Sequence, residues 1–312
     1  FERAPGDRAL VAAGDAIERS TLYYAWRPIF TQLYNIEAAA DPQARRDQIR
    51  ELLPSEAGLL QLAPLLNDVL PSLDFTESAV TKEMRGQVRA DNTRELLVGS
   101  LQLAVARGPR LLILEDAHWL DASSWALALA VCRRVQPLLA VIATRPPSEP
   151  LPTQYEQLLQ MPGLHHLRLQ PLTREDTLSL VCDRLGVSSL PDSVAALIRE
   201  KAEGHPFFSE ELAYALRDSG LIRIVDGQCR LSPDAGDFRS VNIPDTVQGV
   251  ITGRIDRLEP PQQLTLKVAS VIGRVFAYRV LRDVHPVDDD KPKLADYLNT
   301  LDRLDITPRD RP

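Results

Sequence analysis

The first half of the chain alternates short apolar runs with longer stretches of helical pattern. Ala9–Asp15 is one such run, and Arg110–Asp116 and Leu138–Arg145 are apolar almost to their last residues. Continuous apolar strands are typical of a parallel sheet that is covered on both faces. His166–Leu172 alternates apolar and polar residues, which predicts a weaker strand with one exposed face. Strands that alternate with helices indicate βαβ units and therefore an α/β fold.

The segment between the first two expected strands, about residues 35–107, has a mostly helical pattern. Prolines cut it into short pieces, because proline lacks the N–H that a helix interior requires. They stand at Pro42, Pro54, Pro64 and Pro71. The last part, Gln87–Ala106, predicts one amphipathic helix that leads into the second strand. We expect no chemistry in this insertion.

Helical patterns dominate after Pro171. Thr173 and Asp176 have the spacing of a capping box, which predicts the start of a helix. That helix and the two that follow each end at a glycine, the residue that most often closes a helix. A small helical domain is therefore expected from the segments 173–186, 193–204 and 206–220.

A hairpin is predicted over 222–231, because the Asp226-Gly227 pair suits a two-residue turn. Further helical patterns predict a helical or winged-helix third unit, and they cover 243–258, 260–273 and 293–304. We expect three domains in all: an α/β core with its insertion over 1–171, the helical domain over 172–220, and the third unit over 221–312.

The composition is that of a globular chain, with 312 residues of which 44% are hydrophobic and 25% charged. The net charge of −7 repels nucleic acid rather than attracting it. Three widely spaced cysteines fit reduced core thiols of a cytoplasmic protein: Cys132, Cys182 and Cys229. No apolar run approaches the roughly 20 residues that a membrane span needs.

The second expected strand ends in two adjacent acids, Glu115 and Asp116, within the stretch LLILEDAHWLDASSW. The carboxyl ends of parallel strands form the edge at which open α/β folds bind ligands. One carboxylate there can hold Mg²⁺, and the other can orient the water that attacks a nucleoside triphosphate. Two acids can also simply end a buried strand, so the pair alone leaves both interpretations open.

The third expected strand ends in Thr144 and Arg145. In a parallel sheet these residues would bring a hydroxyl and a guanidinium to the same edge as the acids. There they could contact a γ-phosphate or its transition-state charge. An arginine by itself can also solvate a strand end, but the acid pair one βαβ unit earlier favours a phosphate site.

Four other residues of the stretch have structural interpretations. His118 has no second His or Cys at ligand spacing, so we expect a local structural contact rather than a metal ligand. Trp119 and Trp125 are expected to pack in the core or against a helix. Asp121, which precedes Ala-Ser-Ser, is expected to cap a helix.

The run LLILEDAHWLDASSW, followed by LLAVIATRPP, resembles the Walker B and sensor 1 strands of AAA+-like ATPases of the STAND class. It is most similar to the ATPase region of soluble adenylyl cyclases and of large LuxR-type regulators. EGHPFFSEEL resembles the GxP motif of that family, and IPDTVQGVITGRIDRLEPPQQLTLKVASVIGRVF resembles the opening of its winged-helix domain. The resemblance implies a P-loop NTPase sheet, followed by a helical lid and a partial winged-helix domain.

The resemblance also implies ATP and Mg²⁺ as ligands. Glu115 matches the acid that faces Mg²⁺ and Asp116 the acid that polarises water. Many relatives have the two acids in the other order, so either residue could face the metal. Arg145 matches sensor 1, and Thr144 would lie beside the nucleotide.

Gly204 and Pro206 match the GxP motif, which lies against the adenine in that family. From the residues alone they are a helix stop and a helix start. The chain departs from the family in one respect, since no segment reads G-x-x-x-x-G-K-[ST], the loop that holds the phosphates. We expect this loop and the first strand to lie upstream of Phe1. Without them two strands lack a neighbour, and the fragment should be poorly stable and bind ATP weakly.

We therefore expect an ATP-binding and ATP-hydrolysing regulatory module of a larger signalling protein, linked to a cyclase or to transcription. The alternative is a nucleotide-independent interaction scaffold with a degenerate ATPase fold. Expected partners are other domains of the parent protein, a cyclase or DNA-binding domain outside this chain, and oligomerisation is left open. Direct binding of nucleic acid is not expected, because the basic residues of Ile243–Arg282 are spread along several elements with acids among them and form no basic stripe with aromatics.

Overall fold

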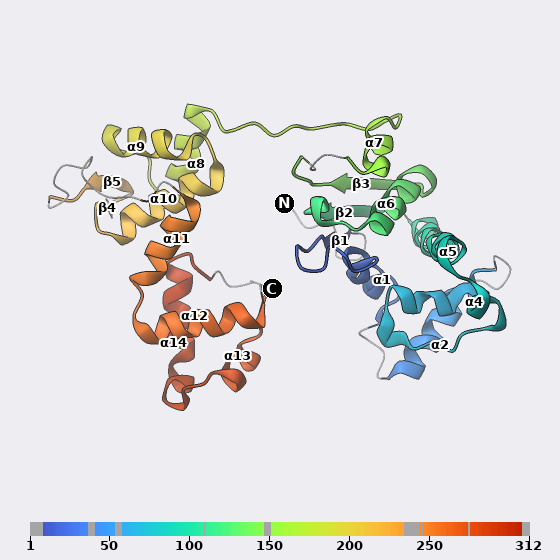
Figure 1. The fold of residues 1–312 in the computed structure, drawn as a ribbon. Coiled ribbons are helices and arrows are strands. Elements are labelled where there is room, and N and C mark those ends of the chain that lie inside the picture. Colours follow the sequence, from blue (N-terminus) through green and yellow to red (C-terminus); the bar gives the residue numbers. More distant parts are fainter. Residues whose placement is uncertain are drawn as a thin grey trace. The chain divides into compact units, whose positions relative to one another are not determined.

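The structure of the chain is a computed structural model that describes residues 9–36, 41–53, 58–108, 110–146, 151–233, 244, 246–273 and 275–307. It has a mixed α/β fold that is mostly helical and contains one small parallel sheet. The chain divides into two compact units, Phe1–Leu167 and Arg168–Pro312, and each is described by itself (Figure 1).

The first unit is built on a three-stranded parallel sheet in the order β1-β2-β3. The strands are β1 (Ala9–Ala13), β2 (Arg110–Glu115) and β3 (Leu138–Ile142). Their register aligns Leu10 with Leu112 and Leu112 with Ala140. The three continuous apolar runs are therefore confirmed as strands of one parallel sheet.

The prediction of a weaker strand at His166–Leu172 is wrong. These residues have no secondary structure, and the side chains of Leu167 and Leu169 are 82% and 93% exposed. A strand forms only when a neighbouring strand takes its N–H and C=O groups. Among the described residues β3 pairs with β2 alone, so its other edge is open.

One face of the sheet packs against helices and forms the main core. Leu10, Ala12, Leu112 and Leu114 point to this face and are at most 6% exposed. They pack with helices that follow β1 and β2 in the chain, namely α1 (Arg27–Leu33), α5 (Gly86–Ala106) and α6 (Ala122–Arg134).

The other face of the sheet is uncovered among the described residues. Val11, Leu139 and Val141 lie there with exposures of 49%, 64% and 44%. The expectation that these strands are covered on both faces is therefore wrong. The reason is topological: both crossovers step in the same direction along the sheet, and right-handed crossovers then place their helices on the same face.

The insertion between β1 and β2 contains short helices, as the prolines predict, followed by the 21-residue helix α5. Pro42 begins α2, and Pro64 and Pro71 lie in the first turns of two 3₁₀ helices. Pro54 lies outside the described residues. In order, the elements are η1 (Tyr24–Trp26), α1, α2 (Pro42–Leu52), α3 (Leu59–Leu62), η3 (Ala63–Asp68), η4 (Pro71–Leu73), α4 (Ala79–Glu83) and α5. The helix predicted over Gln87–Ala106 is confirmed in α5.

An ion pair ties α5 to α6. Arg134 donates hydrogen bonds to both carboxylate oxygens of Glu95, one of them at 2.7 Å from Nη2 to Oε2. These bonds hold the pKa of Glu95 below its ordinary value.

The last described helix of the unit is α7 (Thr153–Leu159), whose Leu158 packs in a small core with Trp125 of α6.

The second unit begins with three helices and a hairpin that share one core. The elements are α8 (Arg174–Leu185), α9 (Asp192–Ala202), α10 (Pro206–Asp218), β4 (Ile222–Val225) and β5 (Gln228–Leu231). Thr173 caps α8 by accepting a hydrogen bond from the Asp176 amide at 3.1 Å, and Gly186 ends that helix in the left-handed conformation. The hairpin turn has positive φ at both Asp226 and Gly227, as its sequence predicts.

The described part of this unit has four more helices, α11 (Val247–Asp256), α12 (Pro260–Ile272), α13 (Tyr278–Val284) and α14 (Leu294–Arg303), with a 3₁₀ turn η7 (Asp288–Lys293) before the last. Of these, α13 has no counterpart among the predicted helices. Arg254 of α11 is only 4% exposed and pairs with Glu211 and Asp218. No helix in the described ranges has the length and apolarity to cross a bilayer.

Candidate functional site

The residues predicted to form a phosphate site follow adjacent strands at the carboxyl edge of the sheet. The amide of Ala143 donates to the carbonyl of Leu114, and the amide of Ala117 donates to the carbonyl of Ala143, both at 2.9 Å. These bonds continue the β2–β3 pairing past the strand ends. Glu115 and Asp116 therefore lie next to the backbone that leads into Thr144, as the sequence predicts.

The two acids leave the strand in different ways. Glu115 is the last residue of β2, in register with Ala13, and strand alternation directs its side chain to the uncovered face. Asp116 has a φ of 49° and a ψ of 38°, which turns the chain into η5 (Ala117–Trp119). Aspartate is among the few non-glycine residues that adopt this left-handed conformation at modest cost. Both acids are exposed to solvent, and 51% of the Asp116 side chain is accessible.

Gly14 fixes the position of the turn at Asp116. Its amide donates to the carbonyl of Glu115 at 2.9 Å. A Cβ atom on Gly14 would lie 2.5 Å from the Asp116 carbonyl oxygen and 3.0 Å from Cβ of Trp119. Only glycine lets the end of β1 approach this backbone so closely. The role of Gly14 could not be predicted from the sequence, since a single glycine after a strand carries no signal of a long-range contact.

His118 makes the local contact that was expected. Its ring lies on Trp119 with the centroids 4.7 Å apart, and Nδ1 is 4.0 Å from Oδ1 of Asp116. Within the described part of the chain neither ring nitrogen has a hydrogen-bond partner. No cluster of three His, Cys, Asp or Glu residues that could hold a metal occurs among the described residues.

Asp121 is confirmed as the cap of α6. Its carboxylate accepts hydrogen bonds from the amides of Ser123 and Ser124 at 2.9 and 3.1 Å. The same carboxylate accepts from the Tyr23 amide at 3.1 Å. Asp121 therefore connects the insertion after β1 to the helix after β2 and holds the loop that carries the acid pair. Trp125, in the first turn of that helix, is 3% exposed and confirmed in the core; Trp119 is partly buried.

Thr144 and Arg145 follow β3 at the same edge. The Thr144 hydroxyl donates to the Arg145 carbonyl at 2.8 Å, and the Arg145 side chain is exposed. Together the edge offers two carboxylates, a hydroxyl and a guanidinium. Mg²⁺ in proteins is commonly held by one or two carboxylates, waters and the phosphates of a bound nucleotide. Glu115 and Asp116 could supply the carboxylate ligands that the protein contributes to such a site.

Gly204 and Pro206 belong to the second unit. Gly204 is buried with a φ of 78°, and its carbonyl accepts from the Leu172 amide at 2.8 Å. A Cβ on Gly204 would lie 2.5 Å from the Leu172 carbonyl oxygen. Pro206 is the first residue of α10, after His205 as the N-cap. The helix stop and helix start are thus confirmed, and Gly204 also serves a close backbone contact.

Parts of the chain are similar to known proteins. The profile of a family described as a domain of unknown function (DUF8739) matches residues 173–230, which are α8–α10 and the hairpin. A stretch of 151 residues, 47% of the chain, is 25% identical to "Adenylate cyclase type 10" of Mus musculus. That stretch covers 9% of the mouse protein, so the chain spans only a small part of this relative.

Proposed function

We propose that this chain is part of a P-loop-type ATPase module of STAND character that binds ATP and Mg²⁺ at the carboxyl edge of its sheet. The observation that carries the proposal is the placement of Glu115, Asp116 and Thr144–Arg145 after neighbouring parallel strands. An acid pair beside a hydroxyl and a guanidinium supplies both metal ligands and groups that can contact phosphate.

The uncovered sheet face and the open edge of β3 support this proposal. A parallel sheet is normally covered by helices on both faces, because parallel strands are joined by helical crossovers. One more strand beside β3, with a helix packed on Leu139 and Val141, would complete such a sheet. We propose that these elements come from chain outside residues 1–312 and carry the loop that holds the phosphates.

The partial likeness to an adenylate cyclase supports a regulatory role for the module. We propose that the chain belongs to a larger signalling protein and that nucleotide binding changes how the helical domains dock. Such a switch requires that nucleotide bind one arrangement more tightly than the other. Within the site, one acid would hold the metal and the other would orient water, and either assignment of Glu115 and Asp116 fits the geometry.

A second function, a nucleotide-independent scaffold, is favoured by two observations. Glu115, Asp116 and Arg145 are exposed, and no Gly-Lys-Ser or Gly-Lys-Thr occurs in the 312 residues to hold phosphates. If the intact reading frame also lacks a phosphate-binding loop, the scaffold function replaces the ATPase proposal.

The experiment that separates the two functions is turnover of Mg-ATP by the protein extended upstream of Phe1. Glu115→Gln and Asp116→Asn each remove one ionised carboxylate with little change of shape. We expect at least one of them to lower turnover by about 100-fold or more, since a metal-bound or water-orienting group contributes several kcal/mol to the barrier. Glu51→Gln, at an exposed acid of α2, is the matched control. Full activity in both site variants would show that the acids do not act in hydrolysis.

A further inference from the structure

The imidazole of His118 is enclosed by protein at the sheet edge that carries the acid pair. Its side chain is 11% exposed, and neither ring nitrogen has a hydrogen-bond partner within the described part of the chain. A buried donor without a partner destabilises the folded state, so such groups are rare in folded proteins and commonly have a functional cause. An apolar side chain could fill the same space without this cost.

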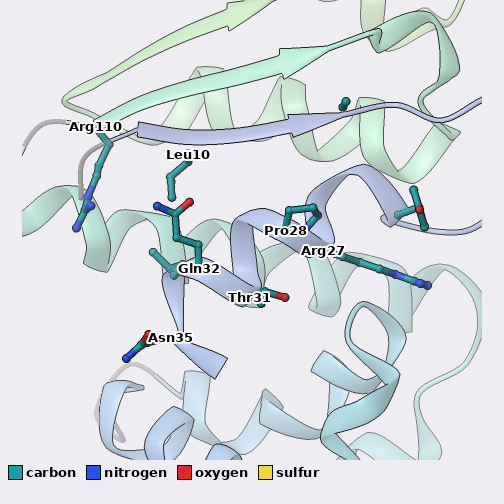
Figure 2. A pocket seen from close by; sticks show the side chains of 10 residues that line it. Leu10, Arg27, Pro28, Thr31, Gln32, Asn35 and Arg110 are labelled. Atoms are coloured by element: carbon teal, nitrogen blue, oxygen red, sulfur yellow. The ribbon is translucent and has the colours of Figure 1, made fainter. Parts of the chain in front are cut away.

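The groove beside β1 does not supply the missing partner. It has a volume of about 840 Å³ and lies between β1 and α1 (Figure 2). Arg27, Thr31 and Gln32 are among the residues that line it, and Figure 2 shows them on the α1 side. His118 is not a lining residue, so water or a ligand in this groove does not contact its ring.

The carboxylate of Asp116 is a polar group close to the ring. Its Oδ1 lies 4.0 Å from Nδ1 of His118. This separation is about 1 Å longer than an ordinary N–H···O hydrogen bond. Since 51% of the Asp116 side chain is accessible, a rotation about its side-chain torsions can close the gap. A neutral imidazole carries hydrogen on one nitrogen only, and this approach favours hydrogen on Nδ1.

The ring of His118 is held more firmly than the acid. It lies on Trp119 with the centroids 4.7 Å apart. The Trp119 amide donates to the Asp116 carbonyl at 3.0 Å, and the Ala117 amide donates to the Ala143 carbonyl at 2.9 Å. These bonds fix the short turn that carries the ring. A fixed donor beside an acid that can turn is suited to orient the carboxylate.

We propose that Nδ1–H of His118 donates a hydrogen bond to Asp116 and orients its carboxylate at the sheet edge. His118 is then a positioning residue that acts through Asp116 and contacts neither nucleotide nor metal. Carboxylates that hold a metal are themselves commonly hydrogen-bonded, and loss of such a partner lowers metal affinity or activity about 10–100-fold. The effect on ATP turnover rests on the proposed function, whereas the hydrogen bond itself needs no nucleotide.

Nitrogen-15 NMR of the histidine rings tests the bond in the 312-residue chain without nucleotide. With neutral rings, the shifts distinguish a nitrogen that carries hydrogen from one that does not, and His118→Ala assigns the signal. We expect hydrogen on Nδ1 of His118, and we expect Asp116→Ala to shift the ratio about fivefold or more toward Nε2. His205 is the internal control, because its Nδ1 accepts from the Phe208 amide at 3.2 Å and its hydrogen is therefore on Nε2.

The consequence for the site is measured in the protein extended upstream of Phe1, as Mg-ATP turnover and as Mg²⁺ affinity in the presence of ATP. We expect His118→Ala to lower whichever of the two quantities Asp116→Ala lowers, by about 10–100-fold. In the Asp116→Ala background the same change should cause little further loss, because the histidine acts through that acid. A residue with a separate structural role would give additive losses.

Two amide variants identify the nitrogen that acts. His118→Asn places an N–H donor where Nδ1 stood, so we expect it to recover most of the activity that His118→Ala loses. His118→Gln places its donor nearer the position of Nε2 and should not recover it. His165→Ala, at an exposed residue away from the sheet edge, is the control and should leave both quantities unchanged.

Three results would overturn the inference: hydrogen on Nε2 of His118 with no response to Asp116→Ala, additive losses in the double variant, or recovery by Gln and not by Asn. Normal turnover in His118→Ala, with a loss in Asp116→Ala, would also contradict it while leaving the proposed function intact. An extended protein that does not bind Mg-ATP would contradict the proposed function, and the ring NMR would still decide whether the bond exists. Thermal unfolding of each variant checks that it remains folded.

Discussion

At the scale of single residues, the candidate site depends on backbone contacts that side-chain chemistry does not reveal. Asp116 turns out of the strand with positive φ, and Gly14 packs against its carbonyl. The acid pair could be located from the sequence because an apolar strand must deliver its next residues to the sheet edge. Gly14 could not, since the contact that requires glycine lies far away along the chain.

Gly14→Ala tests this contact. We expect the free energy of unfolding to fall by about 1–3 kcal/mol, because the added Cβ overlaps the Asp116 carbonyl and forces the strand ends apart. Gly253→Ala is the matched control, since a Cβ at that position would meet no other atom within 4 Å and the φ of Gly253 is ordinary. In the interior of α11 that change should stabilise by about 0.5–1 kcal/mol. Urea unfolding measures both, and a neutral Gly14→Ala would contradict the close approach.

At the scale of elements, helix ends were the most predictable feature. Thr173, Asp121 and Gly186 act as caps in the structure because capping is a local interaction, decided within a few residues. The prediction of a strand at His166–Leu172 was wrong for the opposite reason. The alternating pattern is local, but a strand forms only with a partner strand elsewhere in the chain. Helix α13 was missed because it has only 7 residues and Leu281 is its single fully buried side chain.

Arg254 joins three helices of the second unit, and its removal should destabilise that unit. Its guanidinium bonds to Glu211 at 2.6 Å, to Asp218 at 3.0 Å and to the carbonyl of Leu304 just after α14. It also stacks on the Tyr214 ring, 5.0 Å from the centroid. Arg254→Ala leaves the buried Glu211 without its cation and leaves Asp218 paired with Arg217 alone, so we expect a loss of about 3–5 kcal/mol.

Arg282→Ala is the control for this prediction. Arg282 is half exposed and lies 3.6 Å from Asp283, so its removal should change stability by no more than about 0.5 kcal/mol. Thermal unfolding followed by circular dichroism measures both variants. Similar midpoints for the two would show that the buried ion pairs do not hold the unit together.

At the scale of the whole molecule, helices cover only one face of the sheet in the first unit. The sequence predicted parallel strands correctly, because their apolar composition is a local property. It could not show that Val11, Leu139 and Val141 would be exposed, since the cover of a face depends on which crossovers the chain contains. Patches of this kind commonly mark interaction surfaces.

Leu139→Lys combined with Val141→Lys tests what this face does. In the 312-residue chain we expect less self-association in sedimentation and no large loss of stability, because both side chains are already exposed. In the protein extended upstream of Phe1 the same pair should destabilise by several kcal/mol, because a covering helix would bury the charges. Leu112→Lys, at a residue 1% exposed, should unfold both proteins. Equal effects of the double change in the two proteins would contradict a covering helix.

The stretch His165–Gln170 has a consequence for how the chain survives in a cell or an extract. All six residues are exposed and lack secondary structure, and the boundary between the two compact units falls at Leu167. A protease binds its substrate as an extended, accessible backbone, so this stretch is an accessible cleavage point. A cut there would divide the chain into two fragments, each with its own hydrophobic core: the parallel sheet with Glu115 and Asp116 in the first, and the helices that match DUF8739 in the second.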